Sequence, residues 1–270
     1  ADPGVYKRGW SGLAPERVAD EAAALWRRHA FEELAFQDET FFTQPARVTA
    51  LAEAFLVREL RFTWTATLRA DQGARMDDAL YALLRRSGLR RVMVGVEAGS
   101  QERLDWMQKD ATVEQVLLTA ERLARHDLAA IFNFIVGFPG EPRESVEATL
   151  ALLKRLRRLS PRFETPVFFY RPYPGTPIAE AARAGGYELP ADLDGWAAFD
   201  YVGSRGPWVS AELQAHVERL QFYARHAWGP GGAWRLPLRA AARWRVERDI
   251  YSWPVEKWVL ERLRPPAPRS

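Results

Sequence analysis

The stretch IFNFIVGFPGE, residues Ile131–Glu141, places an apolar run directly before two glycines, a proline and an acid. The run is β-branched, aromatic or aliphatic apart from Asn133, which is typical of a buried strand. Gly137 and Gly140 then allow the backbone to turn or to approach a ligand closely. The stretch predicts a strand whose end is suited to holding a ligand, although a glycine after a strand usually marks only a turn.

Strand and helix signals alternate on both sides of this stretch. Phe62–Arg69 alternates between an apolar face and a threonine-rich face, and Arg91–Val96 and Pro166–Tyr170 are further apolar strands. Segments with helical spacing separate the strands, and we expect Thr43 and Thr112 to cap two of them. Five strand-then-helix units predict a parallel β/α architecture.

A doubly wound sheet and a barrel both fit this alternation. Polar residues gather at the carboxyl ends of several predicted strands, which favours a barrel. The predicted fold class is therefore α/β, with a TIM-like parallel barrel favoured over a doubly wound sheet. Gly185, Gly186 and Pro190 mark a boundary, so we expect the barrel over residues 1–185 and a mainly helical, Trp-rich extension over 186–270. We expect the aromatic residues of this extension to pack against the barrel, among them Trp196, Tyr201, Trp234, Trp244, Trp253 and Trp258.

Composition excludes several classes of protein. The chain has 270 residues, is 47% hydrophobic and carries a formal charge of +3. No apolar run reaches the roughly 20 residues of a membrane span, and no signal peptide is visible, so we expect a cytoplasmic protein without a transmembrane segment. The basic residues are spread along the chain, which argues against nucleic acid as a partner. Two local basic groups, around Arg157 and Arg243, are typical of solvated helix faces.

The chain contains no cysteine and only four histidines. The first fact excludes disulfides, thiolate metal sites and a cysteine nucleophile within this chain.

Polar side chains recur on one face of successive predicted strands. Thr63, Thr65, Thr67 and Arg69 share a face, and so do Met93, Gly95 and Glu97. If these faces line the lumen, the interior is polar and suits a bound ligand. Acids at the strand ends can balance an ammonium group or accept hydrogen bonds from ribose hydroxyls.

Five motifs follow in order: Gln37–Phe41, Arg69–Asp71, Gly95–Gln101, Ile135–Glu141 and Tyr173–Pro177. Together they resemble the radical SAM superfamily. Within it they are most similar to the branch associated with a cobalamin (B12)-binding domain, which includes cobalamin-dependent methyltransferases and the anaerobic Mg-protoporphyrin monomethyl ester cyclases.

The resemblance implies a six-stranded partial barrel in which a [4Fe-4S] cluster binds S-adenosylmethionine (SAM). Each proposed cofactor-binding residue follows a strand. Asp38 and Glu39 match the position that contacts the methionyl ammonium group, and Arg69 matches a polar position after the next strand. The ribose-contacting positions correspond to Glu97 and Ser100, and the adenine-side motif corresponds to Gly137, Phe138 and Gly140.

The chain departs from the family in one respect. Family members hold the cluster with a CxxxCxxC motif, and this chain has no cysteine. The basic segment around Arg8 corresponds to the stretch that follows those cysteines, so we expect residue 1 to fall just after the motif and the barrel to lack its first strand. We therefore expect a radical SAM enzyme as the parent protein, with this chain inactive by itself.

The resemblance also implies a small-molecule substrate and an electron donor such as flavodoxin or ferredoxin. The parent would cleave SAM reductively or relay its methyl group through cobalamin. Two alternatives stay open: a cluster-free scaffold that binds a ligand or partner, and a barrel enzyme of acid/base type. The latter needs a histidine or carboxylate pair at the lumen, and His29, His126, His216 and His226 all fall in helical segments.

Overall fold

The computed structural model describes residues 10–197, 199, 206–229 and 236–262. The basic segment around Arg8 lies outside these ranges, and so do Tyr201 and Trp234. The chain divides into two compact units, which are described separately. Unit 1 comprises residues 1–133 and 162–165, and unit 2 comprises residues 134–161 and 166–270.

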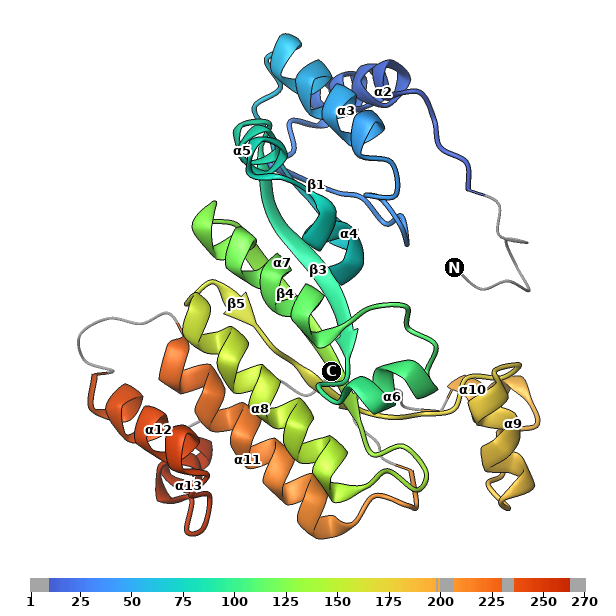
Figure 1. Ribbon diagram of the computed structural model, residues 1–270, viewed down its shortest axis with the longest axis vertical. Helices are drawn as coiled ribbons and strands as arrows, with labels where there is room; N and C mark the ends of the chain where they lie inside the picture. Colours follow the sequence, from blue (N-terminus) through green and yellow to red (C-terminus); the bar gives the residue numbers. More distant parts are fainter. Residues whose placement is uncertain (1–9, 198, 200–205, 230–235, 263–270) are drawn as a thin grey trace. The chain divides into compact units, whose positions relative to one another are not determined.

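Unit 1 holds an open sheet whose strands alternate with helices (Figure 1). The strand order is β1-β2-β3-β4-β5, and β1 pairs in parallel with β2, β2 with β3 and β4 with β5. Among the described residues β1 does not pair with β5, so the sheet is not closed, as in a partial barrel. Its strands are Glu33–Ala35 (β1), Thr63–Leu68 (β2), Leu89–Glu97 (β3), Ala129–Val136 (β4, of which residues 129–133 belong here) and Phe163–Glu164 (β5). Its helices are Pro15–His29 (α2), Pro45–Val57 (α3), Ala70–Arg75 (α4), Asp78–Arg86 (α5), Gln101–Trp106 (α6) and Val113–Arg125 (α7).

The predicted two-residue alternation of β2 is confirmed by burial. Trp64, Ala66 and Leu68 are fully buried, whereas the threonines between them are half-buried. Thr67 lies beside Met93 of β3 in the parallel register, so the half-buried residues of both strands share one face of the sheet. That face is the polar one that the sequence predicts, and Arg69 and Glu97 lie at the carboxyl ends of its two strands.

An aromatic cluster fills the space between β2 and α3. Trp64 contacts Phe42 and Phe55, with ring centroids 6.5 and 6.2 Å apart, and all three side chains are buried. The indole Nε1–H of Trp64 donates to the Ser87 carbonyl at 3.1 Å, so its polar group is satisfied. Removing this side chain is expected to cost about 3–5 kcal/mol, because a large cavity would remain.

Several helices begin at capping residues that the sequence shows, although one predicted cap is wrong and three short elements were not predicted. Asp77 caps α5 by accepting the Leu80 N–H at 2.8 Å, and Thr112 forms the predicted capping box. The prediction for Thr43 is wrong: α3 begins at Pro45, and the Thr43 hydroxyl donates to the Thr40 carbonyl instead. The short elements α4, α6 and β5 were not predicted, because six or fewer residues carry too little periodicity.

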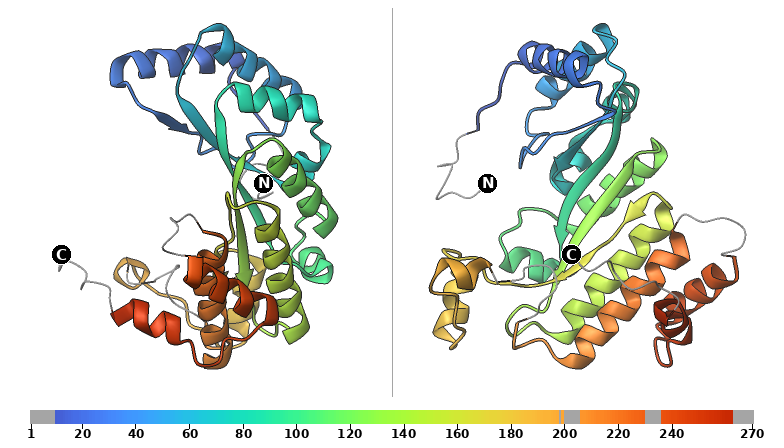
Figure 2. Two further views of the ribbon diagram at one scale, coloured as in Figure 1. Left: turned by 90° about the vertical axis from the view of Figure 1, so that its left-hand side faces the viewer. Right: turned by 180° about the vertical axis from the view of Figure 1, so that it is seen from behind.

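Unit 2 begins with residues 134–136 of β4, to which β6 (Val167–Phe169) pairs in parallel. The rest is helical: Arg143–Leu159 (α8), Pro177–Ala184 (α9), Leu193–Ala197 (α10), Ala211–Trp228 (α11), Leu236–Arg248 (α12) and Val255–Arg262 (α13). Of these, α10 to α13 fall in the extension, which was predicted to be mainly helical. Helices α8 and α11 lie side by side, as Figure 1 and the right-hand view of Figure 2 show.

Side chains of α11 and α12 tie the helices of unit 2 together. The Gln221 amide pairs with both backbone groups of Val167, at 3.1 Å each, and so satisfies these groups of the β6 backbone. Arg245 is only 12% exposed and pairs with Glu256 at 3.0 Å, and its guanidinium also donates to the carbonyls of Ile250, Ser252 and Trp253. These bonds fix the turn between α12 and α13.

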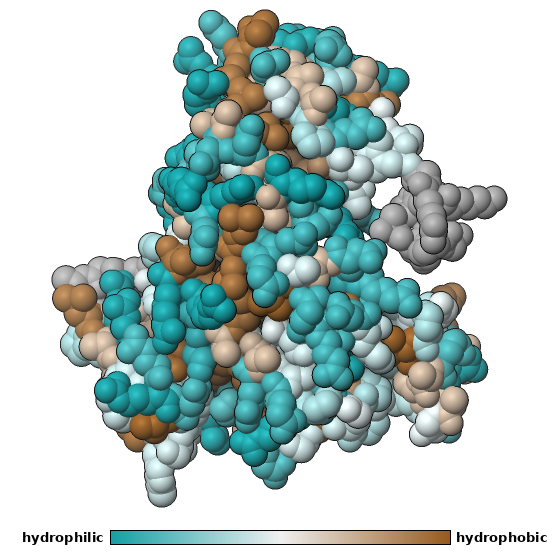
Figure 3. Space-filling model, viewed as in Figure 1, coloured by the Kyte–Doolittle hydropathy of each residue, from teal (hydrophilic) through white to brown (hydrophobic). Residues whose placement is uncertain are grey.

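The structure contradicts the expected packing at three of the aromatic residues of the extension. Trp228 is buried, but Trp244, Trp253 and Trp258 are 46%, 76% and 48% exposed. Figure 3 shows that the side of the molecule drawn is mostly hydrophilic, with hydrophobic side chains in a few places. The prediction that these three side chains pack inward is wrong. Helix α12, which carries Trp244, buries only Ala242 and Val246, and Trp253 and Trp258 lie beyond it, before and on α13.

Candidate functional site

Asp38 and Glu39 lie in the turn that follows β1 in unit 1. Both side chains are exposed, whereas Phe41 and Phe42, which follow Thr40, are buried. Phe41 packs on Trp64 with centroids 5.6 Å apart, which anchors the turn at the carboxyl end of the sheet. The two carboxylates are thus presented to solvent from a fixed base.

Arg69 follows β2 and Glu97 ends β3, and one lysine links them. Lys109, in the loop after α6, donates to Glu97 at 2.6 Å between Nζ and Oε1. Its backbone carbonyl accepts a bond from Arg69 at 3.2 Å, and the Arg69 Nε donates to Asp71 at 2.9 Å. The structure therefore brings two of the predicted residues together. Neither bonds to Asp38 or Glu39 within the described part of the chain.

Glu97 adopts a left-handed backbone conformation, with φ of +69°. Such a conformation is disfavoured for a residue with a β-carbon and is concentrated at functional sites. Its side chain, 20% exposed, folds back over Gly95: a β-carbon added to Gly95 would lie 2.6 Å from Glu97 Oε1 and 3.2 Å from Lys109 Nζ. The carboxylate is thus held over the polar face of the sheet.

Ser100 has a structural partner. Its hydroxyl caps the six-residue helix α6 by accepting the Arg103 N–H at 3.4 Å. This contact orients the loop that follows Glu97, and the hydroxyl can still donate a hydrogen bond.

Sequence reasoning missed Lys109, because a lysine in a loop carries no period or motif. Only the three-dimensional contact with Glu97 identifies it.

In unit 2, the loop after β4 is organised by the acid that ends the quoted stretch. The Glu141 carboxylate accepts the backbone N–H groups of Gly137 at 2.6 Å and Phe138 at 3.2 Å, and the Ser145 hydroxyl at 2.8 Å. Gly137 and Gly140 have φ of +75° and +67°, which explains glycine at both positions. The sequence therefore encodes the loop geometry directly.

A segment from the extension covers Gly137. Trp208 Nε1 donates to the Gly137 carbonyl at 2.6 Å, and Val209 lies where a β-carbon of Gly137 would meet its Cγ2 at 2.6 Å. Phe138 stacks on Tyr170 with centroids 4.6 Å apart. The sequence did not indicate that Trp208 would lie against this loop.

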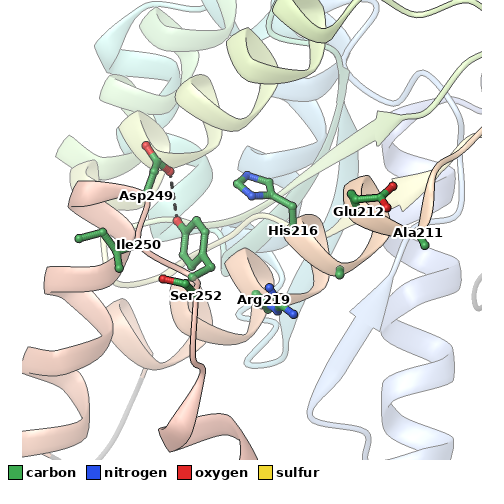
Figure 4. Close-up of a pocket in the computed structure, with 9 residues that line it drawn as sticks. Ala211, Glu212, His216, Arg219, Asp249, Ile250 and Ser252 are labelled. Atoms are coloured by element: carbon green, nitrogen blue, oxygen red, sulfur yellow. Dashed lines mark hydrogen bonds between the residues drawn. The ribbon is translucent and has the colours of Figure 1, made fainter.

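His216 points into a hollow of about 620 Å³ beside α11 (Figure 4). Burial lowers its pKa, an effect that Asp249 opposes and Lys154 reinforces. The lining residues, which include Arg219, Asp249 and Ser252, belong to α11 and the segment after α12 and not to strand ends. This hollow therefore gives no support to acid/base chemistry at the lumen.

The donor set for a metal or cluster is missing from these residues. No group of three or more His, Cys, Asp or Glu side chains in the described ranges can hold a metal ion, and the whole chain lacks cysteine. A [4Fe-4S] cluster needs thiolate ligands, so the residues present do not fit one. Among the described residues, no helix combines the length and the hydrophobicity that a membrane span requires.

An open parallel β/α sheet with polar side chains after successive strands defines a partial-barrel protein with a candidate ligand site at that edge. The chain belongs to the radical SAM superfamily, whose family model matches residues 6–153. This confirms the family that the five motifs indicate.

Two relatives agree with the predicted branch. The chain is 27% identical over 222 residues to an uncharacterized methyltransferase of Pyrococcus horikoshii, covering 82% of this chain and 47% of the relative. It is 29% identical over 140 residues to the anaerobic magnesium-protoporphyrin IX monomethyl ester cyclase of Rubrivivax gelatinosus, covering 52% of this chain and 25% of the relative. The chain thus spans less than half the length of either protein.

The fold also matches a solved structure. The cobalamin-dependent SAM radical enzyme OxsB, with aqua-cobalamin bound, superposes with a TM-score of 0.61 at 15% identity, covering 89% of this chain and 42% of OxsB. At this identity the likeness confirms the predicted fold class, an open barrel of the radical SAM type.

Proposed function

We propose that this chain is the SAM-binding part of a radical SAM enzyme that acts on a small-molecule substrate. The parent reaction would be reductive cleavage of SAM or methyl transfer relayed by cobalamin, with an electron donor such as flavodoxin or ferredoxin. Membership of the superfamily and the methyltransferase and cyclase relatives support an enzyme rather than a cluster-free scaffold. Residues 1–185 would form the catalytic barrel, with 186–270 as an extension.

The proposal assigns to these residues only the binding and orientation of SAM, because they lack the thiolates of a cluster. Glu97 and Ser100 would bind the ribose, and Asp38 and Glu39 would face the methionyl ammonium. Arg69 would hold the Lys109 loop in position. The loop containing Gly137, Phe138 and Gly140 would lie at the adenine.

The conformation of Glu97 is the observation that carries the proposal. A strained backbone holds its carboxylate over Gly95, on the polar face of the sheet. Lys109 contacts only Oε1. Because a carboxylate has about four acceptor sites, Glu97 can accept ribose hydroxyls while it remains paired with Lys109.

Adenosine tests this assignment without a cluster. Calorimetry measures the binding of adenosine and of 2′,3′-dideoxyadenosine to the unsubstituted chain and to the Glu97→Gln variant. We expect the substitution to weaken adenosine about tenfold and to leave the dideoxy compound unchanged, since only ribose hydroxyls need the carboxylate. Glu102→Gln, at an exposed position of α6, is the matched control and should change neither.

An equal loss for both nucleosides would contradict the ribose role of Glu97. Absence of adenosine binding by the unsubstituted chain would contradict the SAM-binding assignment itself.

A further inference from the structure

The two basic groups noted in the sequence meet at one cavity of unit 2. Arg157 and Arg158 lie in the last turn of α8, and Arg239 and Arg243 lie one turn apart on α12. All four line a cavity of about 370 Å³, together with Pro161, Ala227, Trp228, Gly229 and Glu247. The expectation of a solvated helix face is therefore wrong for Arg157, which is buried, whereas Arg158 and Arg243 are exposed as expected.

Two of the arginines are held in place by neighbouring groups. Arg157 is only 5% exposed, donates to the Ala224 carbonyl at 3.4 Å and lies 5.8 Å from the ring centre of Trp228. Arg239 donates to the Gly229 carbonyl at 3.3 Å. Because these contacts order the side chains in advance, a ligand would immobilise less of the cavity on binding.

The charge of the cavity is poorly balanced by its own lining. Glu247 is the one carboxylate among the lining residues, against four guanidinium groups. Arg158 and Arg243 are exposed and form no ion pair within the described part of the chain. By contrast, Lys154 and Arg245 on the same two helices pair with Asp249 and Glu256.

We propose that this cavity binds a phosphate group carried by a small molecule or a lipid headgroup. Guanidinium stays charged throughout the physiological pH range and presents paired donors that match phosphate oxygens. The volume lies at the lower end of the range for small-ligand sites. Trp228 and Ala227 supply an apolar wall for the group attached to the phosphate. No lining residue follows a strand, so the site is additional to the one proposed for SAM.

Titration of inorganic diphosphate into the full chain by calorimetry is the test. Arg158→Gln combined with Arg243→Gln removes two exposed charges from the cavity and should preserve the fold. Arg155→Gln combined with Arg248→Gln removes two exposed charges from the same helices outside the cavity. We expect the first pair to weaken binding about tenfold or more and the second pair about twofold at most.

Sedimentation with phosphatidylglycerol vesicles, against phosphatidylcholine vesicles, separates the two sources of phosphate. Diphosphate binding that is lost in the cavity variant supports a soluble ligand. Binding confined to phosphatidylglycerol vesicles, and lost in the same variant, supports a headgroup. Equal weakening in both variants, or no binding in either arm, would overturn the proposal.

Discussion

Replacing Glu97 by glycine and by alanine separates the backbone strain at this position from the chemistry of its carboxylate. Both changes remove the 2.6 Å contact with Lys109, so their difference in stability reports the backbone at φ of +69°. A left-handed conformation costs alanine about 1–2 kcal/mol, whereas glycine adopts it freely but loses about 0.5–1 kcal/mol more chain entropy on folding. We expect Glu97→Gly to be more stable than Glu97→Ala by about 1 kcal/mol.

Urea unfolding of the two variants, compared through their midpoints at a shared slope, measures this difference. Glu121 provides the control, because it is exposed in the middle of α7, where the backbone is helical. There the order should reverse, with Glu121→Ala more stable than Glu121→Gly by about 1 kcal/mol. If Glu97→Ala were as stable as Glu97→Gly, the inference of strain would be refuted. Both variants at position 97 should bind adenosine equally poorly, since both lack the carboxylate.

Three further results are expected. Gly137→Ala should destabilise unit 2 by about 1–3 kcal/mol in urea unfolding, because its β-carbon would meet Val209 at 2.6 Å and φ is +75°. Adding Val209→Ala should recover part of the lost stability, since it removes the clash. Full stability of the single Gly137→Ala variant would contradict the expectation. Burial raises the pKa of Glu256, but hydrogen bonds from Arg245, its own backbone and Tyr223 outweigh this and hold it below its usual range. Its stabilisation should therefore be complete above the usual carboxyl pKa and disappear as pH falls through the lowered one, and Glu256→Gln should flatten the acid side of a melting-temperature profile; an unchanged profile would argue against it. Finally, the chain incubated anaerobically with iron and sulfide should gain no iron–sulfur absorbance and release no 5′-deoxyadenosine from SAM, whereas either signal would show that non-thiolate ligands suffice.

The sheet was predictable because its information is local. Successive side chains of a strand point to opposite faces of the sheet, so the sequence of β2 alone predicts that Trp64 lies on the buried face and Thr67 on the other. The left-handed backbone conformation was predictable at Gly137, because glycine favours it. It was not predictable at Glu97, because glutamate rarely adopts this conformation.

Contacts between distant segments were not predictable in the same way. Lys109 reaches Glu97 from a loop without periodicity, and Trp208 reaches Gly137 across 71 residues of sequence. The two basic groups around Arg157 and Arg243 each resemble a solvated helix face when read alone. Their convergence depends on how α8, α11 and α12 pack, and no single segment encodes that packing.

In the loop after β4, Gly137 and Gly140 were both predicted to let the backbone approach a ligand, and the structure leaves only one of them accessible. Gly137 was expected to let its backbone meet a ligand, yet Glu141 accepts its N–H, Trp208 donates to its carbonyl and Val209 fills the space beside it. Gly140 differs, since it is exposed and no atom lies within 4 Å of the position of its β-carbon. An adenine edge read by this loop would therefore meet open space at Gly140, whereas contact with the Gly137 carbonyl would require Trp208 to move. Substitution of Trp208 by phenylalanine removes the indole donor and keeps an aromatic ring, so tighter adenosine binding in that variant would place the base at Gly137, and unchanged binding would place it at Gly140.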